Sequence, residues 1–142
     1  MTYRKAVGLM TSFVAIAVVL SGCGVAAHSV KNEVSSMNRQ NLSRLSVGMS
    51  KGDLTSVMGT EVKSGGMVTI SNPYRTETAR DKDGQPVEII LYYTEGGGGI
   101  DNKPITDNDL TPVLLKDGKV IGWGWSSLDR NIQRYQIDIR SR

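Results

Sequence analysis

The spacing of apolar and polar positions divides the chain into a helical part and a strand-rich part. Between residues 38 and 58, apolar side chains recur three or four positions apart, which is the spacing of an amphipathic helix. These side chains are Leu42, Leu45, Leu54, Val57 and Met58. Gly48 interrupts the pattern, and Ser50 followed by Asp53 predicts the capped start of a second helix. Gly59 predicts the end of that helix, so we expect two short helices that each bury one apolar stripe.

After Gly59 the apolar positions recur with period two, which predicts strands. Residues 86–94 form the strongest run, and apolar side chains on both of its faces favour a central place in a sheet. Asp117-Gly118 separates two further runs, residues 111–116 and 119–126, and this dipeptide is typical of a two-residue hairpin turn. Two weaker extended segments are expected, at residues 67–70 and 74–79.

The hairpin turn also predicts which residues face each other. Counting outward from the turn pairs Leu114 with Ile121, so one face of the hairpin should carry four large apolar side chains. These are Leu114, Ile121, Trp123 and Trp125. The other face carries Gly122 and Gly124, and glycine inside a strand often marks the close approach of another backbone.

The end of the chain allows two interpretations. Apolar residues at helical spacing are Leu128, Ile132, Tyr135 and Ile139, whereas those that alternate as in a strand are Tyr135, Ile137 and Ile139. We favour a helix that begins near Ser126 or Ser127. The elements together predict an α+β domain in which two short N-terminal helices pack on a three- or four-stranded antiparallel sheet, followed by this C-terminal helix.

The start of the chain has the pattern of an export signal. A basic pair, Arg4-Lys5, precedes an uncharged and mostly apolar run from Ala6 to Leu20. The run ends in Leu20-Ser21-Gly22-Cys23, which resembles the lipobox of bacterial lipoproteins and implies cleavage after Gly22 and acylation of Cys23. A plain secretory signal and an uncleaved membrane helix are the alternatives, although a bilayer span needs about 20 apolar residues.

Acylation would account for a lone cysteine. Cys23 is the only cysteine of the chain, so an exported form cannot make an internal disulfide. Two or three acyl chains anchor a protein stably. By analogy with enteric lipoproteins, Gly24 in the next position favours the periplasmic face of the outer membrane. We expect a signal peptide at residues 1–22, a flexible tether of small and polar residues at 23–37, and a single domain at 38–142.

Removal of the signal changes the charge balance. The whole chain has 17 basic and 14 acidic residues, and the signal carries two of the basic ones, which leaves 15 against 14 and a net charge of +1. This balance gives no reason to expect a nucleic-acid partner.

The residues that most often carry chemistry are scattered along the chain. His28, the only histidine, falls in the expected tether, where nothing supplies a second ligand. The glycine run at residues 96–99 lacks the Lys-Ser/Thr pair of a phosphate loop, and the nearby aspartates lack the ligand spacing of a calcium loop. No spacing pairs the glutamates for acid–base work. The carboxylates considered are Glu77, Glu88, Glu95, Asp101, Asp107 and Asp109. We therefore predict no catalytic residue, no metal and no cofactor.

Two helices followed by an antiparallel sheet, behind a lipobox, resemble the small outer-membrane lipoproteins of the SmpA/OmlA (BamE-like) group. The segments that carry this likeness are Leu45-Ser-Val-Gly-Met-Ser50, Asp53-Leu54 and Val57-Met58-Gly59. The chain also resembles a sister set of uncharacterised bacterial lipoproteins, through Asn72-Pro73, Leu91–Thr94, Asp109–Pro112 and Lys116–Gly124. The resemblance covers roughly residues 38–126. It implies an α+β fold and a non-catalytic accessory role in the insertion of β-barrels into the outer membrane.

Both faces of the expected sheet are partly apolar. Either the C-terminal segment covers the second face, or an apolar patch stays exposed for a partner. On an exposed face Trp123 and Trp125 are the expected anchors, with Ile121 and Leu114 beside them, because aromatic side chains dominate interface energies. The sequence favours a lipid-anchored scaffold or accessory subunit whose partner is an envelope protein. The alternative is an inhibitor or binding module for a soluble periplasmic enzyme or a small ligand.

Overall fold

The computed structural model describes residues 25–96 and 103–138. The expected signal peptide at 1–22, the acylation point Cys23, most of the glycine run and Ile139 lie outside the described residues. Within the described ranges, no helix is both long enough and apolar enough to cross a bilayer.

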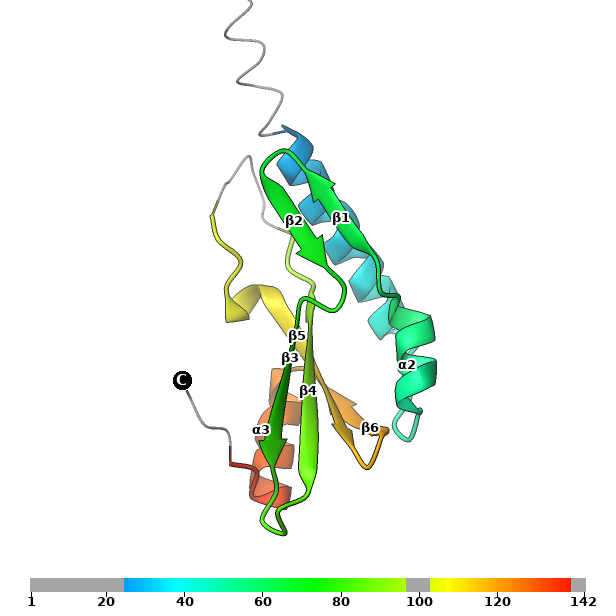
Figure 1. Ribbon diagram of the computed structural model, residues 1–142, viewed down its shortest axis with the longest axis vertical. Coiled ribbons are helices and arrows are strands. Elements are labelled where there is room, and N and C mark those ends of the chain that lie inside the picture. The colour runs from blue at the N-terminus through cyan, green and yellow to red at the C-terminus, as the bar shows by residue number, and fades with distance from the viewer. Residues whose placement is uncertain (1–24, 97–102, 139–142) are drawn as a thin grey trace, which may run out of the picture.

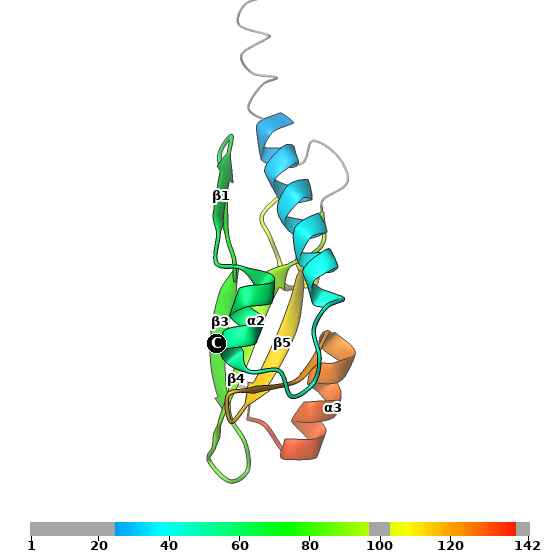
Figure 2. The ribbon, with the colours of Figure 1, turned by 90° about the vertical axis from the view of Figure 1, so that its right-hand side faces the viewer.

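The segment expected to be a tether is helical. One helix covers residues 25–42 (Figure 2), and its buried positions recur every three to four residues. They are Ala27, Val30, Lys31, Val34, Ser35, Asn38 and Leu42. The prediction of a flexible tether at 23–37 is therefore wrong from residue 25 onward. Ser35 donates to the carbonyl of Asn32, and the Asn38 amide nitrogen donates to the carbonyl of Tyr93. These bonds allow polar side chains within the buried stripe, although the buried Oδ1 of Asn38 accepts no hydrogen bond from the described residues.

The second predicted helix is confirmed as α2 (Lys51–Met58). Ser50 caps it, because the backbone N–H of Asp53 donates to the Ser50 hydroxyl oxygen over 3.1 Å and that hydroxyl donates to the Asp53 carboxylate over 2.6 Å. Gly59 ends the helix at a φ of 75°, a conformation that glycine adopts without strain. The buried side chains of α2 are Leu54 and Met58.

The strands form two antiparallel sheets (Figure 1). A small hairpin consists of β1 (Val62–Gly65) and β2 (Val68–Ser71). The main sheet has the order β3-β4-β5-β6, and its strands are β3 (Arg75–Arg80), β4 (Pro86–Tyr93), β5 (Leu110–Lys116) and β6 (Lys119–Trp123). A short 3₁₀ turn, η1 (Asp107–Asp109), precedes β5. The expected α+β class, the four-stranded sheet and the inner position of β4 are thus confirmed.

Both faces of the main sheet are covered, and β4 contributes to each. Val87, Ile89, Leu91 and Tyr93 belong to one buried cluster, whereas Ile90 and Tyr92 belong to the other. The first cluster is closed by α3 (Trp125–Tyr135), through Leu128, Ile132 and Tyr135, and by Val30 and Val34 of the N-terminal helix. The second is closed by α2 together with Leu42 and Leu45. The C-terminal segment therefore covers the face of the sheet opposite α2, as one of the two expected arrangements required.

The end of the chain is helical, as favoured, but the helix begins earlier than expected. Its first residue is Trp125 and its cap is Gly124, at a φ of 82°. Trp125 is consequently a helical residue and does not continue the strand of the hairpin.

The hairpin keeps its predicted register only next to the turn. Asp117 and Gly118 both have positive φ, of 52° and 71°, as a type I′ turn requires, and Leu115 pairs with Val120. Leu114 then pairs with Gly122 instead of Ile121, because a β-bulge adds one residue to β6 at this point. The bulge reverses the alternation, so Trp123 packs in the cluster of α2 while Ile121 and Leu114 face α3.

Different elements form the two ends of the molecule (Figures 1 and 2). The first described turn of the N-terminal helix and the β1–β2 hairpin lie at one end, and the β3–β4 turn and the end of α3 lie at the other.

Candidate functional site

The structure does not bring together the four side chains expected on one docking face. Leu114 is fully buried, and Trp123 is half-buried on the opposite side of the sheet. Trp125 is 40% exposed, and its indole N–H donates to the carbonyl oxygen of Leu110 over 2.8 Å. The prediction of a single face made of Leu114, Ile121, Trp123 and Trp125 is therefore wrong. Ile121 lines a depression in the surface.

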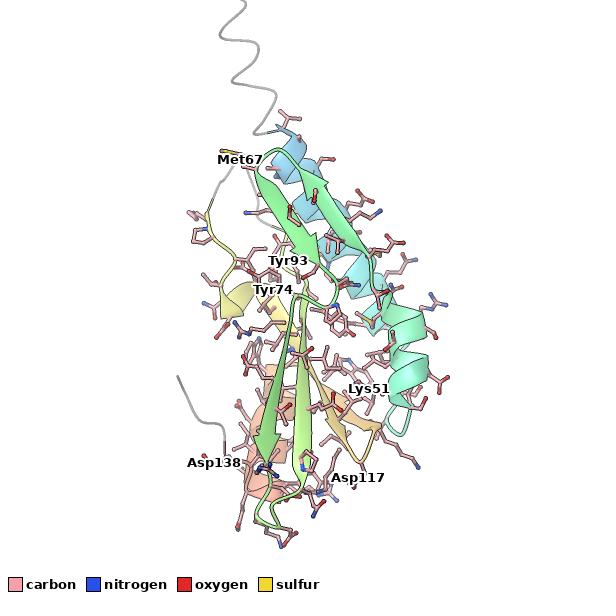
Figure 3. The ribbon with its side chains drawn as sticks, viewed as in Figure 1. Lys51, Met67, Tyr74, Tyr93, Asp117 and Asp138 are labelled. Atoms are coloured by element: carbon pink, nitrogen blue, oxygen red, sulfur yellow. The ribbon has the colours of Figure 1, made fainter. Side chains whose placement is uncertain are left out.

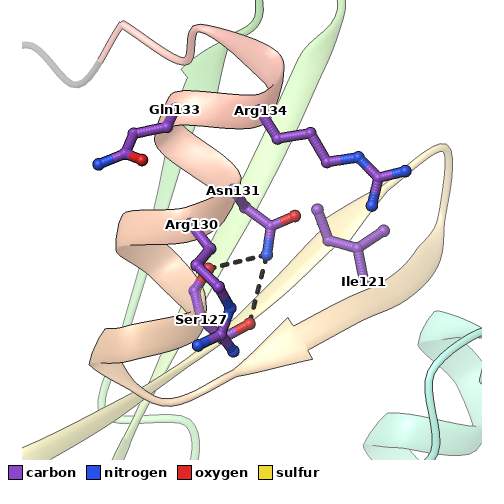
Figure 4. A pocket seen from close by; sticks show the side chains of 6 residues that line it. All are labelled: Ile121, Ser127, Arg130, Asn131, Gln133 and Arg134. Carbon is purple, nitrogen blue, oxygen red and sulfur yellow. Dashed lines mark hydrogen bonds between the residues drawn. The ribbon is translucent and has the colours of Figure 1, made fainter.

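That depression lies between β6 and α3 and has a volume of about 590 Å³ (Figure 4). Its lining residues are Ile121, Ser127, Arg130, Asn131, Gln133 and Arg134. We call it the α3 depression. Five of the six residues come from α3, so the helix supplies the polar groups and β6 supplies the single aliphatic one.

Gly122 allows α3 to pack closely against β6. A Cβ at this position would overlap the Ser127 hydroxyl oxygen and would lie 3.3 Å from the Ser127 Cβ and 3.5 Å from the Asn131 amide nitrogen. A helix does approach closely at this bare position, but its nearest atoms belong to side chains and not to the backbone that was expected. The bulge at Ile121 turns its side chain toward the same helix.

The inner wall of the α3 depression is held by a pair of buried polar residues. The Asn131 amide donates to the Ser127 carbonyl over 2.8 Å and to the Ser127 hydroxyl over 3.3 Å, and both residues are buried. These bonds orient the Asn131 amide along one turn of the helix (Figure 4). The pair gives the depression a fixed polar wall next to Ile121.

Arg130 and Arg134 provide the charge of the α3 depression. They are exposed and lie four residues apart, so they share one face of the helix. Neither guanidinium forms an ion pair with any residue in the described part of the chain. Like charges at this spacing destabilise an isolated helix by about 0.2–0.5 kcal/mol. The arrangement is suited to an anionic group, which would relieve the repulsion.

Tyr135 connects this charge to a second cationic group. The guanidinium of Arg134 lies 5.4 Å from the centre of the Tyr135 ring, and the ammonium of Lys116 lies 5.5 Å from it. Lys116 is neutralised by a salt bridge to Asp81, whose side chain is only 2% exposed. The hydrogen bond from Lys116 holds the pKa of Asp81 below its ordinary value, and the Asp81 carboxylate raises the pKa of Lys116. Of the two cationic groups at the Tyr135 ring, Arg134 is therefore the one without a carboxylate partner in the described part of the chain, and Arg130 lies one helical turn away.

The α3 depression can bind a carboxylate or a phosphate. A guanidinium donates two parallel hydrogen bonds to either group, and the exposed part of Ile121 offers apolar contact beside them. In the described ranges no group of three His, Cys, Asp or Glu side chains lies close enough to hold a metal ion.

Sequence reasoning missed Arg130, Arg134, Ser127 and Asn131. The recurrence of arginine at four-residue spacing was visible in the sequence, and so was the bare position at Gly122. These two signals become informative only in combination, once a helix is placed over the glycine.

Comparison with known proteins yields one family. A family model described as "Protein of unknown function (DUF3192)" matches residues 15–130. No curated protein and no solved structure matches the chain. The resemblance to the SmpA/OmlA group is not tested by these findings and stays a prediction. Since the matched segment runs from the apolar stretch near the N-terminus into the first half of α3, the chain belongs to the DUF3192 family.

Proposed function

We propose that the protein is a lipid-anchored, non-catalytic accessory subunit of the bacterial cell envelope that docks an acidic segment of a partner protein at the α3 depression. The observation that carries the docking role is the pair Arg130 and Arg134, two exposed guanidinium groups beside Ile121 in a depression of about 590 Å³.

The anchor is supported by the Leu20-Ser21-Gly22-Cys23 sequence, the lipobox resemblance described above. Each methylene buried in the bilayer contributes about 0.8 kcal/mol, so the acyl chains on Cys23 would hold the protein stably. The described helix includes residue 25, so the acylated Cys23 would be only two residues away from it in the chain. The domain is then kept at the membrane surface.

The position of the α3 depression supports presentation to a partner. Its lining residues come from α3 and β6, and these elements lie toward the end of the molecule opposite the first described helical turn (Figures 1 and 2). A domain anchored through Cys23 would therefore expose the arginines to the periplasm. Exposed charge pairs contribute about 0–1 kcal/mol each, so the arginines mainly provide orientation and encounter rate.

The partnership with outer-membrane assembly rests on the resemblance to the SmpA/OmlA group, and the outer-membrane location rests on Gly24. A second candidate function, binding of a small anionic ligand, is favoured by the same two guanidinium groups beside the fixed Ser127–Asn131 wall.

The docking role is tested by cross-linking in intact cells. A photo-reactive amino acid replaces the exposed Gln133 at the rim of the depression, and captured envelope proteins are identified by mass spectrometry. We expect an adduct with a barrel-assembly component, reduced several-fold by Arg130→Glu. Arg44→Glu is the matched control, because Arg44 is also exposed and has no ion pair with a described residue.

Three results would count against this function. Capture of soluble enzymes alone would favour the inhibitor function, and absence of any adduct would contradict docking at α3. Equal loss in both variants would show that the charge of the whole protein matters and not the depression.

A further inference from the structure

The end of the molecule near residue 25 joins the N-terminal helix to the tip of the β1–β2 hairpin (Figures 1 and 2). The two elements touch at Gly65, where a Cβ would lie 2.6 Å from Val30 Cγ2 and 3.0 Å from the carbonyl oxygen of Ala26. Glycine is needed for this approach. The hairpin tip is thus fixed beside a helical turn that begins two residues after Cys23 in the chain.

This end carries exposed apolar side chains and little charge. Met67, at the tip of the hairpin, is 85% exposed, and Val25 is 58% exposed (Figure 3). Residues 64–72 contain no Asp, Glu, Lys or Arg, and neither do residues 25–30. A single exposed methionine would be ordinary on a protein surface. Here two elements present apolar groups at the same end without a charged residue in either segment.

Charged side chains begin one layer further from the tip. The ammonium of Lys63 lies 3.2 Å from a carboxylate oxygen of Glu33 and 3.2 Å from one of Glu61. The hydrogen bond to Glu61, followed by that to Glu33, raises the pKa of Lys63. Lys31, which lies on the N-terminal helix with Glu33, donates to the carbonyl of Lys103. An apolar tip followed by a belt of charges and polar groups is the pattern of a surface that meets the bilayer at the headgroup level.

We propose that this end, the hairpin cap formed by Val25, Gly65, Gly66, Met67 and Val68, rests in the headgroup region of the membrane beside the acyl chains on Cys23. The inference rests on the lipid anchor of the proposed function. Lipid is the favoured occupant over a second copy or a protein partner because the chain leaves the described domain toward Cys23 at this end. Contact of the cap with lipid sets the orientation of the domain and turns the α3 depression away from the bilayer.

The test measures the depth of one residue in the bilayer. A Met67→Cys chain is purified with its native lipid, labelled with the fluorophore NBD, and reconstituted in vesicles of phosphatidylethanolamine and phosphatidylglycerol. The acylated Cys23 cannot react, so the label reports position 67 alone. The matched control is Lys82→Cys in the β3–β4 turn, at the opposite end of the molecule, where the Lys82 side chain is 54% exposed.

We expect blue-shifted NBD emission at position 67 and quenching by spin-labelled lipid that is several-fold stronger than at position 82. Equal quenching at both positions, with both chains in the vesicle fraction, would overturn the inference and leave the anchor intact. A blue shift that grows with protein density, without quenching by spin-labelled lipid, would assign the cap to contact with a second copy. That result would also overturn the inference. Labelling of the unsubstituted chain would show a free Cys23 thiol, which is the separate failure of the anchor.

Discussion

At the scale of single residues, the position of α3 depends on Gly122. This residue has no side chain where Ser127 and Asn131 cross β6, and the polar wall of the α3 depression exists only because the helix comes so near. Gly52 in α2 is different, since the nearest atom to an added Cβ is the Ser50 hydroxyl oxygen at 3.8 Å.

Gly122→Ala should lower the free energy of unfolding by about 1–3 kcal/mol, because the added methyl group forces α3 away from β6. Gly52→Ala serves as the control and should be neutral or stabilising by up to about 1 kcal/mol, since alanine favours the helix. Urea unfolding of both variants checks the prediction. Equal effects at the two positions would contradict the close packing at Gly122.

The salt bridge between Asp81 and Lys116 gives a pH dependence with a defined sign. The pKa of Asp81 is lowered in the folded protein by the hydrogen bond from Lys116. The contribution of Asp81 to the free energy of unfolding is therefore complete above the ordinary carboxyl pKa of about 3.9, and it is lost as the pH falls through the pKa of the folded protein. The pKa of Lys116 is raised by Asp81. The contribution of Lys116 to the free energy of unfolding is complete below the ordinary pKa of lysine, and it is lost as the pH rises through the pKa of the folded protein.

Asp81→Asn should therefore lower the urea midpoint at neutral pH, and the difference from the unsubstituted protein should shrink as the pH falls below about 4. Urea titrations at a series of pH values measure this. A difference that stays constant down to strongly acidic pH would mean that the carboxylate charge contributes nothing.

At the scale of elements, sequence reasoning succeeded where a local rule decides the structure. Ser50 with Asp53 identified the start of α2, and Asp117-Gly118 identified the hairpin turn, because capping and turn conformation involve neighbouring residues. It failed at the β-bulge, which moved Trp123 to the other face, since nothing local to Ile121 distinguishes a bulge from regular pairing. The α3 depression was missed for a related reason, because it exists only after two distant elements have packed.

The N-terminal helix is the largest difference from expectation. Its buried stripe includes Ser35 and Asn38, so the apolar periodicity that identifies most helices is weak. The stripe is recognisable only when the hydrogen bond from Asn38 to the carbonyl of Tyr93, in another element, is known.

The packing of this helix can be tested by shortening one side chain. Val34 is 1% exposed in the core cluster of β4 and α3, so Val34→Ala should cost about 2 kcal/mol of unfolding free energy. Ser36→Ala on the exposed side of the same helix should change it by less than about 0.5 kcal/mol. Chemical denaturation of both variants distinguishes the two cases. Equal stability of the two would mean that the segment behaves as the tether first expected.

At the scale of the whole molecule, the two ends have different chemistry. The hairpin cap is apolar and lies where the chain leads back to Cys23, whereas the α3 depression carries two arginines and lies toward the other end. A helix from residue 25 leads from the proposed anchor into the core of the domain. The molecule is thus built to hold one end at a surface and to present the other, provided that Cys23 carries lipid.

The acylation of Cys23 is tested most directly by the mass of the N-terminal peptide of protein extracted from membranes. We expect residues 1–22 to be absent and the first residue to be a cysteine with two or three acyl chains. A chain that keeps residues 1–22, or one that begins with an unmodified residue, would contradict the anchor and with it the orientation of both ends.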